Sequence, residues 1–356
     1  MMKKYKILCL AGGGVRAVVT CKWIETLKKE GFLNTDEVDL YSGTSAGSMV
    51  VAGLIKPDPY KIEDMKEIAY DIMKHAFKRS KWIPANLSLL CTGSKYHTKN
   101  LEEAAKSVFG GDSVLFGDCK PAVINVYDRY RKYRDVRRAM GHSLTNMNQL
   151  SEKETRFCEM PLYKIITASC VAPMAFDKYM PDITYKSKTG EMKTRTFNFT
   201  DGGQADNLGM ISAVRIARRA YCSTGKIIND FDDSGSVPFK NMRVLGIGNG
   251  GVWNFQKPLE YKKGIISSVY RRFRATAKMT IGTIVQESEV RSLETTRDVF
   301  GKHENHVRYI NYQLPEEIAL DDLSAVGELE RFAEEKSKRI EVDQDIRSWF
   351  KGYWHG

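Results

Sequence analysis

A chain of 356 residues that is 42% hydrophobic and 28% charged has the composition of a globular protein, which argues against a disordered chain. No window approaches the roughly 18 consecutive apolar residues of a membrane-spanning helix, and seven scattered cysteines without a C-x-x-C pair favour a reducing compartment over a disulfide scaffold. The net charge of +11 indicates attraction to polyanions, either nucleic acid or an anionic membrane.

Two strand-then-helix units open the chain. Residues 6–10 are predicted as a short buried strand, because the apolar run is too short for a secretory leader and leads directly into a glycine loop. The helix that follows has one apolar face and ends near Gly31. A second short strand at 38–42 precedes residues 46–55, which are apolar all round and rich in small residues and so predict a deeply buried helix.

The rest of the chain continues this alternation. Further strands are predicted at residues 120–127, 133–136, 195–200 and 242–247, and further helices within 60–110 and at 162–172 and 211–221. Residues 223–240 and 251–263 are predicted as loops, and the remainder as charged helix. Strands that alternate with helices indicate an α/β fold with a largely parallel sheet.

Ser45 lies in the turn between the second strand and the buried helix, flanked by Gly43 and Gly47. A serine hydroxyl becomes a useful nucleophile only when its geometry is fixed and a base takes its proton. The G-x-S-x-G spacing lets the chain reverse sharply and exposes the serine oxygen above the sheet edge. The alternative is a glycine-rich turn in which Ser45 caps the helix. Placement between two apolar elements favours the nucleophile.

The loop Gly12-Gly13-Gly14 opens the first helix, and three functions fit it. Its backbone N–H groups suit an oxyanion, the helix N-terminus suits the pyrophosphate of a dinucleotide, and the loop is also compatible with a simple tight turn. Arg16 follows in the first helical turn, where a cation opposes the helix dipole. A structural carboxylate and a substrate phosphate are equally good partners for it.

Asp201 stands at the end of a predicted strand, and two glycines, Gly202 and Gly203, leave room around it. This is the setting expected of a catalytic base, whereas the alternative is an Asx turn or a helix cap. Asp206 and Asn207 suit capping better, because they directly precede a predicted helix. No metal-ligand spacing occurs, so we expect neither a metal nor a cofactor.

Three segments, GGGVRA, GTSAG and TDGGQADNLG, resemble in this order the patatin-like phospholipase family, and PLYKIITASCVAPMAF and MRVLGIGNGG are similar to its supporting segments. The resemblance covers roughly residues 6–250. It implies a three-layer α/β/α fold with a mostly parallel sheet, and lipid ester hydrolysis through an acyl-enzyme without calcium in the chemistry. Carried over onto this sequence, it makes Ser45 the nucleophile, Asp201 the base, and the amides of Gly13 and Gly14 the oxyanion donors.

One position departs from the family pattern. Ala17 stands where most members have a glycine after the basic residue, which puts the packing of this loop in question. The GGG-x-R-A form resembles instead the animal cytosolic phospholipases of the same fold, in which the arginine helps to hold the lipid phosphate. Arg16 is therefore a candidate phosphate contact. We divide the chain into a patatin-like catalytic domain, 1–250, and a basic helical C-terminal region, 251–356, packed on it.

Basic segments that carry aromatic residues, 74–84 and 270–279, suit an anionic lipid surface or a solvated helix face. Residues 128–138 are predicted as a hairpin between two strands. The aromatic residues near the C-terminus either pack back on the body or touch membrane. Since no nucleic-acid-binding module accompanies these charges, the expected partner is a phospholipid membrane surface or lipid substrate, not nucleic acid. The sequence does not identify a protein or small-molecule activator.

The sequence thus predicts a cytoplasmic, peripherally membrane-associated lipid acyl hydrolase of phospholipase A or lysophospholipase type, and it leaves delivery into another cell as an effector open. A catalytically silent lipid-binding or regulatory protein is the first alternative. An α/β-hydrolase triad with a base such as His303 is the second, although none of the six histidines lies beside a motif.

Overall fold

The computed structural model describes residues 4–78, 94–133, 136–147, 150, 156–186, 189–223, 238–251, 265–316 and 318–356. For residues 130–133, 136–139, 221–223, 238 and 265–282 it describes the backbone alone. The predicted loops at 223–240 and 251–263 therefore lie mostly outside the described residues.

The strands of the described part form one seven-stranded sheet and a separate two-stranded hairpin. The sheet contains β1 (Tyr5–Leu10), β2 (Leu40–Thr44), β3 (Ala122–Tyr133), β4 (Val136–Thr145), β7 (Phe199–Asp201), β8 (Met242–Ile247) and β9 (Val307–Ile310), and the hairpin contains β5 (Asp182–Lys186) and β6 (Met192–Thr196). The sheet order is β4-β3-β2-β1-β8-β9, with β7 paired to β3. The run from β3 to β9 is parallel, whereas β4 and β7 pair antiparallel with β3.

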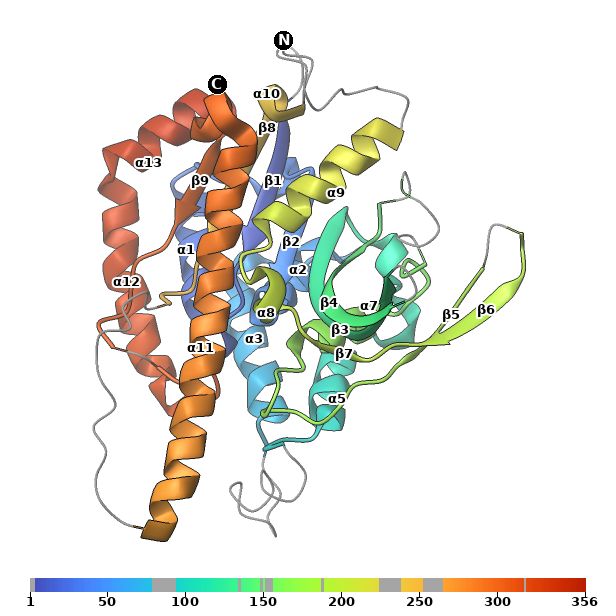
Figure 1. Cartoon of the computed structure of the whole chain (residues 1–356). Coiled ribbons are helices and arrows are strands. Elements are labelled where there is room, and N and C mark those ends of the chain that lie inside the picture. The colour runs from blue at the N-terminus through green and yellow to red at the C-terminus, as the bar shows by residue number, and fades with distance from the viewer. Residues whose placement is uncertain are drawn as a thin grey trace.

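Helices cover both faces of this sheet (Figure 1). They are α1 (Ala17–Lys29), α2 (Ala46–Ile55), α3 (Ile62–Ala76), α5 (Thr98–Val108), α7 (Leu162–Cys170), α8 (Gly203–Asp206), α9 (Met210–Ser223), α10 (Pro238–Asn241), α11 (Ile265–Phe300), α12 (Val326–Val342) and α13 (Gln344–Trp349). Successive side chains of a strand point to opposite faces. Leu8 and Leu10 accordingly join the core built with α1, α2 and α12, and Ile7 and Cys9 join the core built with α9 and α11. The predicted three-layer α/β/α architecture with a mostly parallel sheet and C-terminal helices is confirmed.

Helix α2 confirms the prediction of a deeply buried helix at residues 46–55. All ten of its residues are buried, as expected for a helix that is apolar on every side. Small residues allow this close packing: a Cβ placed at Gly53 would lie 2.2 Å from the sulfur of Met65 on α3. The C-terminal aromatic residues are also settled, since Trp349, Phe350 and Trp354 are buried and pack back on the body.

Two strand predictions and one helix prediction need correction. Residues 133–136 are not a separate strand, because β3 continues to Tyr133 and β4 begins at Val136; the predicted hairpin over 128–138 is present. The segment 195–200 is interrupted between β6 and β7. Strand β9, which extends the sheet beyond β8, lies where charged helix was expected, because its four residues are too few to show an alternating pattern.

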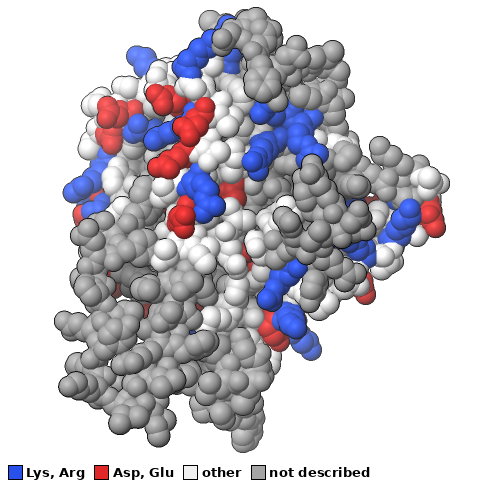
Figure 2. Space-filling view, viewed as in Figure 1, with Lys and Arg blue, Asp and Glu red and all other residues white. Residues whose placement is uncertain are grey.

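The described surface shows no simple basic face. In Figure 2 acidic and basic side chains are interspersed over the C-terminal helices, while basic side chains predominate over α9. Residues 79–84 and the side chains of 270–279, which were considered for membrane contact, lie outside the described part. Among the described residues, no helix combines the length and the apolar character required to cross a membrane.

Candidate active site

Ser45 occupies the sharp turn between β2 and α2. Its φ of 51° lies in the left-handed region, which costs a non-glycine residue on the order of 1–3 kcal/mol and persists only where the surroundings enforce it. The Ser45 amide donates to Ser169 Oγ at 2.9 Å, and the Ser169 hydroxyl donates to Asn125 O at 2.7 Å, so that α7 and β3 hold the turn. Ser45 stands at the N-cap position of α2 but makes no capping hydrogen bond with its side chain.

The glycines on either side of Ser45 leave no space for a side chain. A Cβ at Gly43 would lie 2.8 Å from Ser48 Cα, and a Cβ at Gly47 would lie 2.3 Å from Leu10 O. Both distances are far below an ordinary van der Waals contact. The G-x-S-x-G spacing therefore lets the turn pack directly against α2 and the end of β1.

Asp201 ends β7 and faces the same turn. Its amide donates to Val171 O at 2.8 Å, and its Oδ1 accepts a hydrogen bond from the Gly203 amide at 2.7 Å. A Cβ at the intervening Gly202 would lie 2.2 Å from Asn125 O, so that this glycine allows the chain to turn against β3. Backbone contacts on both sides thus fix the carboxylate.

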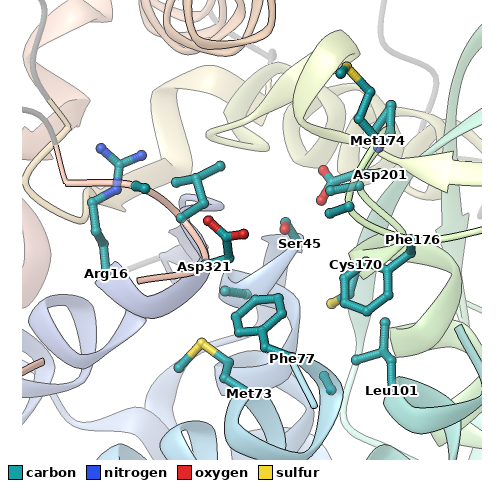
Figure 3. Close-up of a pocket in the computed structure, with 18 of the residues that line it drawn as sticks. Arg16, Ser45, Met73, Phe77, Leu101, Cys170, Met174, Phe176, Asp201 and Asp321 are labelled. Carbon is teal, nitrogen blue, oxygen red and sulfur yellow. The ribbon is translucent and has the colours of Figure 1, made fainter. Parts of the chain in front are cut away.

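The side chains of Ser45 and Asp201 meet. Figure 3 shows them next to each other, close enough for the Ser45 hydroxyl to stabilise the ionised form of the Asp201 carboxyl. Burial raises the pKa of Asp201 from 3.8 to about 6, although the Ser45 hydroxyl and the Gly203 amide oppose this rise. A carboxylate with a pKa close to neutrality is well suited to take a proton from a hydroxyl that it already contacts.

The glycine loop lies directly beside Ser45, since a Cβ at Gly12 would be 2.8 Å from Ser45 Cβ. The amide of Gly12 donates to Asn207 O at 3.1 Å, and the amide of Val15 donates to Leu320 O at 2.9 Å. Between them, the amides of Gly13 and Gly14 donate to no group among the described residues. Gly14 has a φ of 55°, so that the loop needs a glycine at this position.

A cavity of about 200 Å³ opens beside the Ser45–Asp201 pair. Most of its wall is apolar and comes from α2, α3, the segment 172–176 after α7 and the segment 318–321, with single residues from α5 and α7. The apolar side chains labelled in Figure 3 are Met73, Phe77, Leu101, Met174 and Phe176. A largely apolar pocket lined also by a hydroxyl–carboxylate pair fits a substrate with a hydrocarbon portion next to a reactive polar group.

Arg16 ends a single 3-10 turn before α1 and is only 6% exposed. Its Nε donates to Gly13 O at 3.4 Å. Burial and the nearby Glu289 raise the pKa of Tyr309, and the charge of Arg16 opposes this rise. Figure 3 places Arg16 at the cavity wall across from Phe176. The role of Arg16 as a phosphate contact stays a prediction.

A polar clasp that sequence reasoning missed lies at the same side of the cavity. Lys95 Nζ donates to Asp321 Oδ2 at 2.6 Å, and the Tyr96 hydroxyl donates to the same oxygen at 2.9 Å. Burial alone would raise the pKa of Asp321, but Lys95 and Tyr96 hold it below its usual value. The clasp fixes the loop 318–322 of the C-terminal region against the segment that precedes α5. No local sequence signal indicates this pairing.

The remaining candidate residues lie elsewhere. None of the six histidines lines the described part of the cavity, and His303 stacks on His306 with ring centroids 5.0 Å apart. Asp206 caps α9 as predicted, accepting from the amides of Gly209 and Ser212 at 2.7 and 2.9 Å. Asn207 does not cap; its side-chain amide donates to Gly12 O at 3.1 Å instead.

The chain is similar to known proteins of one family. The family model described as patatin-like phospholipase matches residues 8–214, a range that contains both Ser45 and Asp201. The chain is 22% identical over 277 residues to Patatin-like protein 3 of Arabidopsis thaliana, covering 70% of this chain and 60% of that protein. It is 21% identical over 265 residues to Patatin-like protein 2 of Oryza sativa subsp. indica, covering 70% of this chain and 62% of that protein. The chain thus spans about 60% of the length of these curated relatives.

Proposed function

Because the chain belongs to the patatin-like phospholipase family, we propose that it is a lipid acyl hydrolase of phospholipase A or lysophospholipase type. The observation that carries the proposal is the position of the Ser45 hydroxyl beside a buried carboxylate, Asp201, whose pKa burial raises to about 6. The apolar cavity beside this pair supports an acyl chain as the bound group.

In the proposed reaction, Ser45 Oγ attacks the ester carbonyl carbon while Asp201 takes the hydroxyl proton. The carbonyl oxygen becomes an oxyanion, for which the Gly13 and Gly14 amides are the proposed donors. The bond from carbon to the leaving alcohol then breaks, and Asp201 returns the proton to the alcohol. Water attacks the resulting acyl-enzyme in the same way, giving its proton to Asp201, and the fatty acid leaves as the Ser45 hydroxyl re-forms.

We assign most of the rate enhancement to groups that are in position before the substrate binds. Removal of one oxyanion donor in a serine hydrolase costs about 10²–10³ in kcat, and here both proposed donors lie in a loop held from each side by Asn207 and Leu320. The strained turn at Ser45 keeps the nucleophile in its reactive position before substrate binds.

We further propose that Arg16 contacts the lipid phosphate and that the enzyme acts at a phospholipid surface. The net charge of +11 is consistent with an anionic surface. We retain the division into a catalytic domain, 1–250, and a C-terminal region, 251–356, as part of this proposal.

The test is hydrolysis of phospholipid vesicles by the wild-type chain, Ser45→Ala and Asp201→Ala, with release of fatty acid as the readout. Ser107→Ala, at an exposed serine on α5, is the matched control. We expect both active-site variants to lose turnover and the control to retain it. Full hydrolysis by Ser45→Ala would refute the site assignment, whereas a folded wild-type chain that binds vesicles without hydrolysis would favour the catalytically silent lipid-binding alternative.

A further inference from the structure

Helix α11 presents a row of buried polar side chains to the active-site loops. Ser288, Glu289, Ser292 and Thr296 recur at the spacing of one helix face, and each is at most 3% exposed. A helix that packs on a sheet normally buries apolar residues, and buried polar groups are costly unless they are hydrogen-bonded. This row therefore requires an explanation in terms of its partners.

Two of the serines hold the loop between Asp201 and α9. The Ser288 hydroxyl donates to Gly203 O at 2.5 Å and accepts from the Asn207 amide at 3.2 Å. The Ser292 hydroxyl accepts from the Ile211 amide, also at 3.2 Å. Gly203, two residues after Asp201, is thereby held against α11.

Glu289 extends this support to the glycine loop. Its Oε2 accepts from Asn207 Nδ2 at 2.8 Å, and its Oε1 accepts from the Tyr309 hydroxyl. The same Asn207 Nδ2 donates to Gly12 O at 3.1 Å, and Asn249 Nδ2 donates to Gly12 O at 2.6 Å. Because a Glu289 oxygen and the Gly12 carbonyl both accept from Asn207 Nδ2, Glu289 helps to hold the Nδ2 end of the Asn207 amide, and not Oδ1, toward Gly12.

Peptide geometry carries this effect to the proposed oxyanion donor. The Gly12 carbonyl and the Gly13 N–H belong to one planar trans peptide and point in opposite directions. Holding the carbonyl toward Asn207 and Asn249 aims the Gly13 N–H away from them. Asn249 also packs directly against Gly13, since a Cβ placed there would lie 2.4 Å from Asn249 Nδ2.

We propose that Glu289 is a positioning residue for the oxyanion loop, acting through Asn207 on the Gly12–Gly13 peptide. The inference rests on the proposed function. Since Glu289 and Tyr309 lie beyond the family match at residues 8–214, the C-terminal region is part of the active-site machinery and not only a cover for the sheet.

The test variant is Glu289→Gln, which keeps the shape of the side chain. A glutamine can donate to Asn207 Oδ1 and so allows the Asn207 amide to turn away from Gly12. Small misplacements of a reacting group cost about 10²-fold in rate, and we expect kcat to fall about 10–100-fold with KM changed less than about twofold. Glu294→Gln, at an exposed position on the same helix, is the matched control and should keep wild-type kcat.

A pair of inhibitors separates positioning from a general structural defect. A long-chain trifluoromethyl ketone adds to the serine and places an oxyanion in the donor site, whereas an amide analogue of the phospholipid mimics the ground state. We expect Glu289→Gln to weaken the ketone about 10–100-fold and to leave the Kd of the amide analogue unchanged. The inference would be overturned if Glu289→Gln weakened the binding of both inhibitors equally or of neither.

Tyr309→Phe provides a second variant if Glu289→Gln folds poorly. It removes one donor to Glu289 and keeps the ring, and we expect a smaller loss of ketone affinity, about 3–10-fold, again with unchanged binding of the amide analogue. Unchanged ketone affinity would count against the inference. A wild-type chain that neither hydrolyses phospholipid nor binds the ketone refutes the proposed function itself, whereas an active wild type with fully active variants refutes the positioning role alone.

Discussion

Replacement of Asp201 by asparagine should abolish turnover and yet stabilise the protein at neutral pH. The asparagine side chain keeps an oxygen that accepts from the Gly203 amide, as Asp201 Oδ1 does at 2.7 Å, but it carries no charge into the buried site. The folded protein holds the Asp201 proton up to a pH of about 6, whereas the reference pKa of the carboxyl is 3.8. The folded state binds more protons between these values, so stability falls as the pH rises through this window.

The magnitude follows from the two pKa values. A difference of about two pH units, at about 1.4 kcal/mol per unit, corresponds to a cost of about 3 kcal/mol for the ionised group above pH 6. Unfolding entropy of about 2 cal/mol/K per residue gives about 0.75 kcal/mol/K for 356 residues. Removal of the charge should therefore raise Tm by about 4 °C at pH 8.

Thermal unfolding of the wild type and Asp201→Asn between pH 4 and pH 8 measures this effect. The gain in Tm should shrink as the pH falls from 6 to 4, because the wild-type carboxyl becomes protonated there. Asp71→Asn, at an exposed position on α3, should leave Tm within about 1 °C at every pH. A lower Tm for Asp201→Asn at pH 8, or a gain that does not depend on pH, would refute the reasoning.

Three further predictions concern catalysis. Since Asp201 must be ionised to act as a base, kcat/KM for the wild type should rise with pH around a midpoint near 6 and then level off; a profile that is flat from pH 4 to 8 would contradict this. Gly13→Ala should lower kcat about 100-fold, because the new Cβ would lie 2.4 Å from Asn249, while Gly327→Ala, which meets nothing within 4 Å, should retain activity in the same assay. Phe77→Ala should widen the cavity and shift the kcat/KM ratio toward bulkier acyl chains by up to about tenfold in competition assays, and an unchanged ratio would argue against this cavity as the acyl site.

The parts of the fold and the site that were predictable from sequence are those encoded locally. The glycines around Ser45 and after Asp201 stand within two residues of the functional side chains in the sequence, so they leave a short motif, although the atoms that exclude a Cβ at Gly47 and Gly202 come from the distant Leu10 and Asn125. The buried helix 46–55 is equally evident, because every one of its residues is apolar or small. The catalytic roles of these residues stay predictions.

The supporting residues could not be predicted, because they converge from distant segments. Asn207 was interpreted as a cap from its position before α9, but its side chain serves the glycine loop instead. Asn249 lies in a glycine turn, Glu289 in the middle of a long helix and Tyr309 in a strand of four residues. Their relation exists only in three dimensions, as does the clasp between Lys95 and Asp321.

The most direct test of the account is to trap the acyl-enzyme or its analogue and to locate it. The wild-type chain is treated with a long-chain fluorophosphonate, digested and mapped by tandem mass spectrometry. The account predicts a single adduct on Ser45, which disappears in Ser45→Ala and persists in Ser107→Ala. Labelling of another residue, or equal labelling of Ser45→Ala, would contradict the assignment of the nucleophile and the mechanism built on it.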